Sequence, residues 1–185
     1  MLNHIDVSSV LRQTLACDLY SNLVTRPTGA AVRNQIELLL SDSSERALTV
    51  IDFSRVSMID FSCADEVVAK LLMRYLSDDP PCDAYFLFRG VTEDHCDAIE
   101  AVLERHDLAA AVEDDGRVRL MGVLRDDERR AWEAAYELGR ADAMEIALRM
   151  DEGIAIAEEA LESLCRRRVM MKADGQYVVV GNLRG

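Results

Sequence analysis

The chain has 185 residues and half of them are hydrophobic, which is enough for one or two small domains with buried cores. Its formal net charge of −13 argues against a general binder of nucleic acid or anionic membranes, because an acidic surface repels phosphate groups. The N-terminus has no basic start followed by an apolar core, and no run approaches roughly eighteen apolar residues. We therefore expect a cytoplasmic protein without a membrane contact.

The cysteines and histidines show no spacing typical of a metal site or a disulfide framework. We expect free thiols, no metal and no other cofactor. The run Asp94-His95-Cys96-Asp97 points its side chains in different directions on a helix, so it indicates a solvated helix start rather than a catalytic pair. The cysteines of the chain are Cys17, Cys63, Cys82, Cys96 and Cys165, and its histidines are His4, His95 and His106.

Residues 5 to 26 give an ambiguous pattern, since the Leu-rich run from Leu11 to Leu23 fits a strand as well as a helix. The segment Pro27-Thr28-Gly29 predicts a break in the chain. A helix follows, and its expected core-facing residues are Ala31, Val32, Ile36, Leu39 and Leu40.

Residues 48 to 76 combine a strand, a polar turn and a helix in one unbroken unit. The strand is the apolar run from Leu48 to Phe53, with β-branched members as expected of a strand covered on both faces. The turn carries Asp60 and Ser62. The helix has a core face at Ala64, Val68, Leu71, Leu72 and Tyr75, and its opposite side carries Asp65, Glu66, Lys70 and Arg74.

The run from Ile51 to Ala64, IDFSRVSMIDFSCA, resembles the signature of STAS domains, the fold of bacterial anti-sigma factor antagonists. The positions that match in order and spacing are Asp52, Val56, Asp60 and Ser62. The resemblance covers roughly residues 20 to 115, and it places Ser62 where the family carries its phosphorylated Ser or Thr.

Two positions depart from this signature, because Phe61 replaces a Ser and Cys63 replaces a Gly. The continuation Ala64-Asp65-Glu66 is more similar to a divergent STAS-like group with a Ser-Phe-Ala-Asp-Glu run. The resemblance implies that a partner protein docks around Ser62, and that the residues contacting it are Asp60, Cys63, Asp65 and Glu66.

Ser62 also fits a purely structural role. A Ser followed three residues later by an acid, here Asp65, is typical of a helix N-cap with a capping-box partner. The two interpretations are compatible, since a helix N-terminus also favours a phosphate.

The chain then alternates strands and helices, with a strand at residues 84 to 88 and a helix facing the core through Ile99, Val102 and Leu103. Two strands follow at residues 108 to 112 and 118 to 123. This order predicts right-handed crossovers and an α/β fold, a STAS-like mixed sheet with covering helices, in a first domain of residues 1 to 124.

Residues 125 to 185 form a second predicted domain, which begins at a charged run. Three short helices precede two strands that flank Asp174-Gly175, a strong hairpin signal. This α+β order resembles a winged helix-turn-helix, with Gly153 in the turn, the third helix in the recognition position and the hairpin as the wing.

DNA binding by this second domain is disfavoured. It carries 10 Lys or Arg against 13 Asp or Glu, a net of −3, and its third helix has Glu158, Glu159 and Glu162 where a reader of the major groove needs Arg, Asn or Gln. Protein docking or a homodimer is the favoured role. The candidate residues for docking or DNA contact are Arg166, Arg167, Arg168 and Lys172.

The sequence therefore favours a non-enzymatic bacterial signalling protein that binds an anti-sigma factor or a kinase-like ATPase and switches at Ser62. The alternative is a transcription regulator that binds DNA through the winged helix. No Gly-rich phosphate loop and no nucleophile with its base is recognisable, so we expect no catalytic residues and no enzyme activity.

Overall fold

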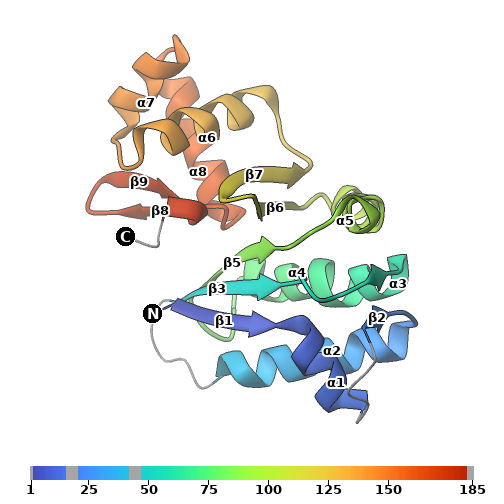
Figure 1. Ribbon diagram of the computed structural model, residues 1–185. Coiled ribbons are helices and arrows are strands. Elements are labelled where there is room, and N and C mark those ends of the chain that lie inside the picture. Colours follow the sequence, from blue (N-terminus) through green and yellow to red (C-terminus); the bar gives the residue numbers. More distant parts are fainter. Residues whose placement is uncertain (1, 16–20, 42–46, 183–185) are drawn as a thin grey trace. The chain divides into compact units, whose positions relative to one another are not determined.

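The computed structural model describes residues 2–15, 21–41 and 47–182. The chain divides into two compact units, Met1–Gly122 and Val123–Gly185, where the sequence placed the boundary after residue 124. Figure 1 shows the helices and strands of each unit. In the described part of the chain, no helix combines the length and the apolar character needed to cross a membrane.

Unit 1 contains a five-stranded mixed sheet in the order β1-β3-β5-β6-β7. The first four strands are parallel and the last pair is antiparallel, with Ile5 opposite Ile51 and Ile51 opposite Phe88 in the register. This confirms the predicted mixed α/β architecture. The strands are β1 (Leu2–Asp6), β3 (Ala47–Asp52), β5 (Ala84–Arg89), β6 (Ala109–Asp114) and β7 (Arg117–Gly122).

The helices of unit 1 connect the parallel strands, and the chain between Phe61 and Leu76 is helical throughout but not uniform. Its central turns are π-helical, in the segment η1. The remaining pair of strands, β2 and β4, forms a short parallel sheet of its own. The elements are α1 (Val7–Leu15), β2 (Asn22–Leu23), α2 (Arg26–Ser41), β4 (Met58–Ile59), α3 (Phe61–Ala64), η1 (Asp65–Lys70), α4 (Leu71–Leu76) and α5 (Glu93–Arg105).

The ambiguous residues 5 to 26 comprise the end of β1, all of α1 and β2 and the first residue of α2, while residues 16–20 lie outside the described residues. The expected break at Pro27-Thr28-Gly29 is wrong, because these residues form the first turn of α2. A proline is tolerated there, since its missing N–H has no partner in a first helical turn.

The core of unit 1 lies between these helices and the sheet. Val32, Ile36 and Leu40 are buried at a spacing of four residues along α2. Leu39 lies outside this stripe and is exposed, so its predicted core position is wrong. Phe86 of β5 and Tyr75 of α4 contact each other edge to face, with their ring centroids 5.0 Å apart.

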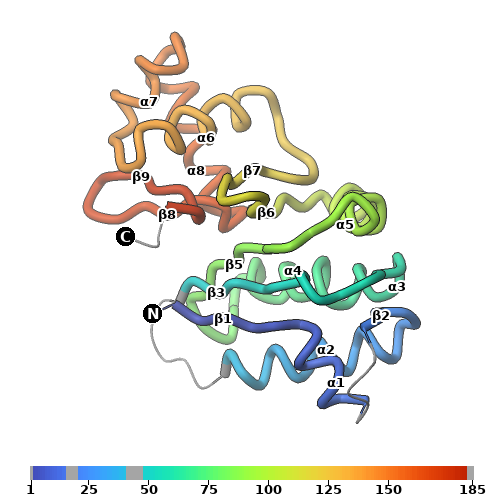
Figure 2. Tube along the Cα trace, viewed as in Figure 1, coloured from blue at the N-terminus to red at the C-terminus, as the bar shows by residue number. Residues whose placement is uncertain are grey.

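Unit 2 consists of three helices followed by a hairpin, and Figure 2 traces this course from α6 to β9. The hairpin turns at Asp174 and Gly175, both with positive φ, as the Asp-Gly pair predicts. An isolated bridge pairs Ala141 with Tyr177 of the hairpin. The elements are α6 (Asp126–Leu138), α7 (Ala143–Met150), α8 (Ile154–Arg166), β8 (Met170–Ala173), β9 (Gln176–Val179) and the 3₁₀ turn η2 (Val180–Asn182).

Three hydrogen bonds stabilise the interior of unit 2. The indole Nε1 of Trp132 donates a hydrogen bond to the carbonyl oxygen of Val169, 3.3 Å away. The carboxylate of Glu128 is buried and accepts a hydrogen bond from the hydroxyl of Ser163 at 2.5 Å and from the backbone N–H of Arg125 at 2.8 Å. These bonds tie α6 to α8 and to the chain entering β8.

Gly29 in α2 permits a close approach between α2 and α3. A Cβ at this position would lie 2.9 Å from the Cα of Cys63 and 3.1 Å from the Cβ of Glu66. Backbone atoms cannot retreat as the end of a flexible side chain can, so α2 would have to move away from α3.

We predict that Gly29→Ala destabilises the protein. Alanine improves helix propensity by about 1 kcal/mol, but overpacking typically costs about 1–3 kcal/mol, and the backbone contact places this site at the higher end. Denaturant unfolding measures the difference. Gly153→Ser is the control, because no atom lies within 4 Å of a Cβ built at Gly153 and Ser is a good N-cap residue. A Gly29→Ala protein as stable as the wild type would contradict the close packing.

Candidate functional site

The turn that carries Ser62 is held against the entry to α2. Strands β2 and β4 pair in parallel, with Asn22 opposite Met58 and Leu23 opposite Ile59. The backbone N–H of Asp60 donates to the carbonyl oxygen of Leu23, 2.9 Å away. The segments that lead into α2 and α3 therefore lie side by side.

Asp60 is the N-cap of α3. Its Oδ1 accepts hydrogen bonds from the backbone N–H of Cys63 at 2.7 Å and from the hydroxyl of Ser62 at 2.8 Å. Its Oδ2 accepts from the backbone N–H of Thr25 at 2.9 Å. Burial raises the pKa of Asp60, but these hydrogen bonds outweigh it and the pKa is lowered overall.

The predicted N-cap role of Ser62 is therefore wrong. A hydroxyl offers one donor and two acceptor sites, whereas the carboxylate of Asp60 can accept all three donors around it. Ser62 instead lies inside the first turn of α3, is half-buried and donates to Asp60. Asp65, its supposed capping-box partner, is engaged elsewhere.

Cys63, which the sequence offered as a partner-binding residue, is buried in this conformation. Its Sγ donates to the carbonyl oxygen of Thr25, 3.0 Å away. Burial, followed by the neighbouring Asp60 carboxylate, raises the pKa of the thiol to about 12. At neutral pH Cys63 is a thiol that ties α3 to the start of α2.

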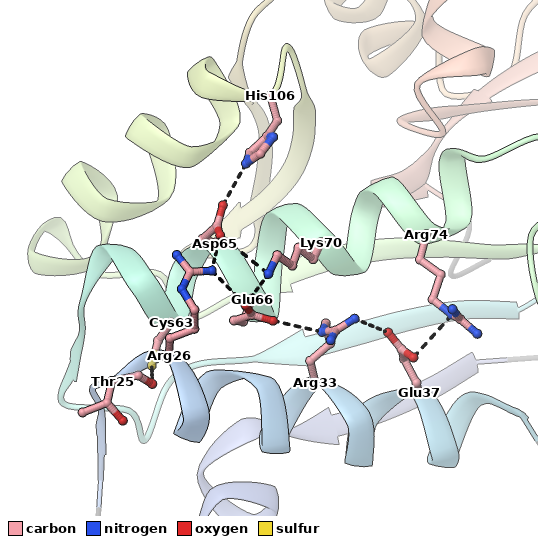
Figure 3. A network of polar contacts seen from close by, with 10 residues as sticks. All are labelled: Thr25, Arg26, Arg33, Glu37, Cys63, Asp65, Glu66, Lys70, Arg74 and His106. Atoms are coloured by element: carbon pink, nitrogen blue, oxygen red, sulfur yellow. Dashed lines mark hydrogen bonds and ion pairs between the residues drawn. The ribbon is translucent and has the colours of Figure 1, made fainter.

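Asp65 and Glu66 form an acidic pair inside the helical layer, only 5% and 2% exposed. One terminal nitrogen of Arg26 donates to Asp65 Oδ2 at 2.7 Å and to Glu66 Oε1 at 2.8 Å. His106, at the C-cap of α5, places its Nε2 2.8 Å from Asp65 Oδ1. Figure 3 shows the pair between Arg26 and His106.

Further cations surround Glu66 from the other side. The ammonium of Lys70, one helical turn along, pairs with Glu66 Oε1, and the Nε of Arg33 lies 3.4 Å from Glu66 Oε2. This last contact is an ion pair without hydrogen-bond geometry. Arg33 also bonds Glu37 at 3.2 Å, and Glu37 pairs with Arg74 at 3.3 Å, so the network extends along α2 and α4 (Figure 3).

The carboxylates of this pair stay ionised. Burial raises the pKa of Asp65, but hydrogen bonds from Arg26 and His106 outweigh it and the pKa is lowered. For Glu66 burial likewise raises the pKa, and the bonds from Lys70 and Arg26 reverse the direction. The site is a buried cluster of mutually compensated charges.

The predicted positions of Asp65 and Glu66 on the solvent side of their helix are wrong. Residues Cys63 to Ala69 are all buried, because α2 packs against one side of α3 and η1 and α5 packs against the other. These two side chains are therefore inaccessible to a partner in this conformation. Periodicity could not reveal this, since Arg26 and His106 are 39 to 41 residues away in the sequence.

His95 is also inside, although the sequence indicated a solvated helix start. It is buried, and its Nδ1 accepts a hydrogen bond from the backbone N–H of Thr92, 3.2 Å away, as part of a capping box. Burial lowers the pKa of His95. A neutral capping histidine explains the residue without a catalytic role.

The four basic residues predicted as docking or DNA contacts in unit 2 differ in their surroundings. Arg166 is exposed at the end of α8, whereas the Nε of Arg167 lies 3.8 Å from the buried Glu128. Arg168 adopts a left-handed conformation with φ 54°, and Lys172 stands over the ring of Tyr177, 5.0 Å from its centroid. Two of the four residues, Arg167 and Lys172, therefore have contacts within unit 2.

We predict that Asp60→Ala costs more stability than Ser62→Ala. Loss of the N-cap costs about 1 kcal/mol, and loss of the bond to Thr25 adds to it, whereas Ser62→Ala removes one hydrogen bond of about 0.5–1.5 kcal/mol. Denaturant melts of both variants decide the order. If Ser62→Ala were the more damaging change, Ser62 would be the cap after all.

The acidic pair predicts a pH dependence of stability. The folded pKa values of Asp65 and Glu66 lie below the unfolded values of about 3.9 and 4.3, so their contribution is complete above these values and is lost as the pH falls through the folded pKa values. The protection factors of the amides in η1, which correct the hydrogen-exchange rates for the intrinsic effect of pH, should therefore fall below about pH 4.3.

Removing one carboxylate tests the same cluster at neutral pH. Glu66→Gln leaves Lys70, Arg26 and Arg33 undercompensated and should cost about 3 kcal/mol, with a shallower loss of stability in acid. The control is Glu100→Gln on the exposed face of α5. Equal stability and an unchanged acid slope in Glu66→Gln would show that the cluster does not stabilise unit 1.

In the described residues no group of three or more His, Cys, Asp or Glu side chains is arranged to hold a metal ion. The geometry instead offers a hydrogen-bonded turn at Ser62, next to the ion pairs of Asp65 and Glu66. Protein-family models give no match to this chain, and curated proteins give none either.

Proposed function

We propose that the chain is a non-enzymatic signalling protein whose unit 1 is a STAS-like domain that binds a partner protein beside Ser62. One observation carries this proposal. Met58 and Phe61, which flank Asp60, are large apolar side chains that remain 47% and 39% exposed on a turn held by side-chain and backbone hydrogen bonds. Exposed apolar groups on a rigid support are typical of binding surfaces.

The surface around these residues, here called the Ser62 rim, consists of Met58, Phe61, Ser62 and Arg105. The guanidinium of Arg105 lies 5.7 Å from the ring centroid of Phe61, which joins the end of α5 to the turn. An aromatic ring beside an arginine matches the residue types enriched at interface hot spots. A kinase-like ATPase or an anti-sigma factor is the partner class that the STAS resemblance implies.

Modification of Ser62 would act on this rim through Asp60. The hydroxyl of Ser62 is a donor to a carboxylate that already holds the backbone of Thr25 and Cys63. A phosphate would remove that donor and set roughly −1.5 to −2 charges beside Asp60. The resulting repulsion would loosen the link between the entry to α2 and α3, and so alter the rim.

The order of helices and strands supports the proposed folds, a STAS-like domain for unit 1 and a winged helix for unit 2. In unit 1, parallel strands with connecting helices and a serine at the start of α3 fit a STAS-like domain. In unit 2, three helices followed by a hairpin, with the extra bridge between Ala141 and Tyr177, fit a winged helix. DNA readout remains the weaker candidate, because Glu158, Glu159 and Glu162 are exposed on α8.

The test begins by finding the partner from the rim itself. A photo-crosslinking residue at position 58 should capture a kinase-like ATPase or an anti-sigma factor in the native cell, and the same residue at position 38 should not. Leu38 is also an exposed apolar residue of unit 1, on α2, which makes it a matched control. Identical captures from both positions would argue against the rim.

Calorimetry with the purified partner then separates docking from switching. We expect Phe61→Ala to weaken binding roughly tenfold, as for an interface hot spot, and Leu39→Ala to leave it unchanged. Ser62→Asp should weaken binding while Ser62→Ala retains it. Equal affinities for wild type, Ser62→Ala and Ser62→Asp would refute the switch, and an unaffected Phe61→Ala would refute the rim.

A further inference from the structure

Helix α7 is apolar on two opposite sides. Ile146, Ala147 and Met150 are buried in unit 2, while Met144 and Leu148, four residues apart on another side, are 60% and 82% exposed. A surface helix normally turns a polar face to water, and a helix that is apolar all round is normally covered.

The two polar side chains of α7, Glu145 and Arg149, both have partners within unit 2. Glu145 accepts a hydrogen bond from the backbone N–H of Asp142 at 2.9 Å in a capping box. Arg149 pairs with Glu137 of α6. The outward side of α7 therefore presents Met144 and Leu148 beside the exposed Glu145 and Arg149, whose polar groups already have partners within unit 2.

The acidic charge of unit 2 is concentrated around this helix. Residues 142 to 162, which span α7, the turn and most of α8, contain seven Asp or Glu against one Arg, a net of −6. The rest of residues 125 to 185 contains nine Lys or Arg against six Asp or Glu, a net of +3. The charge asymmetry within unit 2 is thus large.

One side of α8 begins with an apolar residue and continues with acidic residues. Ile154, Glu158 and Glu162 follow each other at a spacing of four residues, which places them along one side of the helix, and all three are exposed. Glu159, on the neighbouring stripe, lies 3.6 Å from Arg125. This side of α8 combines an apolar end with two exposed acidic groups.

We propose that α7 and α8 form a docking surface for a basic amphipathic helix of a partner protein. Met144, Leu148 and Ile154 receive its apolar side, and Glu158 and Glu162 pair with its Lys or Arg residues. Duplex DNA does not fit, because its phosphates would meet the same carboxylates. The same segment of a second copy does not fit either, since two segments of net −6 repel each other. The proposal is independent of the Ser62 rim.

The test uses the full-length chain and fluorescence anisotropy with labelled synthetic peptides. An amphipathic helix built from Leu and Lys should bind, and its Leu and Glu counterpart should not. Leu148→Ser and the double variant Glu158→Gln, Glu162→Gln should each weaken binding roughly fivefold or more, as loss of an interface contact worth about 1 kcal/mol predicts. These residues are exposed, so the variants should melt like the wild type.

Matched controls lie on unit 1. Leu38→Ser removes another strongly exposed Leu, and the double variant Glu100→Gln, Glu104→Gln removes the same charge from the exposed face of α5. Both should bind the Leu and Lys peptide as the wild type does. If the controls weaken binding equally, the attraction is only that of an acidic protein, and the docking surface is refuted.

Three other results would also overturn the proposal. One is the absence of binding to the Leu and Lys peptide. Another is self-association of the chain that Leu148→Ser abolishes, measured by sedimentation, which would assign the surface to a second copy. The third is binding of duplex DNA at physiological salt that depends on residues of α7 or α8.

Discussion

Two adjacent carboxylates lie inside the helical layer of unit 1, and the arrangement around them follows from the need to compensate their charge. A buried, unpaired carboxylate is costly enough that it would become protonated or move to water. Asp65 and Glu66 avoid this because Arg26 and Arg33 reach them from α2, Lys70 from their own helix and His106 from the end of α5. The positions of three helices are thereby coupled.

This coupling reaches the surface at the turn before α3. Arg26, which bonds both carboxylates, directly follows Thr25, whose backbone N–H and carbonyl oxygen bind Asp60 and Cys63. The side chain of Arg26 and the backbone of Thr25 therefore fix the same helix entry. A chemical change at Ser62 would therefore act on a connected set of hydrogen bonds, and its effect could extend to the helices around Asp65 and Glu66.

The sequence predicted the parts of the fold whose signals are local. The apolar run at residues 48 to 53 and the Asp174-Gly175 pair correspond to β3 and to the hairpin of unit 2. The burial of Asp65 and Glu66 could not be predicted. A charged residue at helical spacing indicates a solvent-facing side, unless the partners that it meets from distant parts of the sequence are known. The choice of Asp60 over Ser62 as N-cap also depended on a third donor, Thr25, from another segment.

The π-helical segment Asp65–Lys70 affects how this helix should be compared with the same helix in related proteins. A π turn closes a hydrogen bond to the fifth residue along rather than the fourth, so it holds one more residue than an α turn. Relatives that lack this segment should be one residue shorter between Ser62 and Leu71. Because the π turn takes up the extra residue within about one turn, the helix after it keeps its orientation, and Tyr75 would stay against Phe86 in the shorter helix as well. Alignments of this helix will therefore need a gap there, and its two halves should be compared separately.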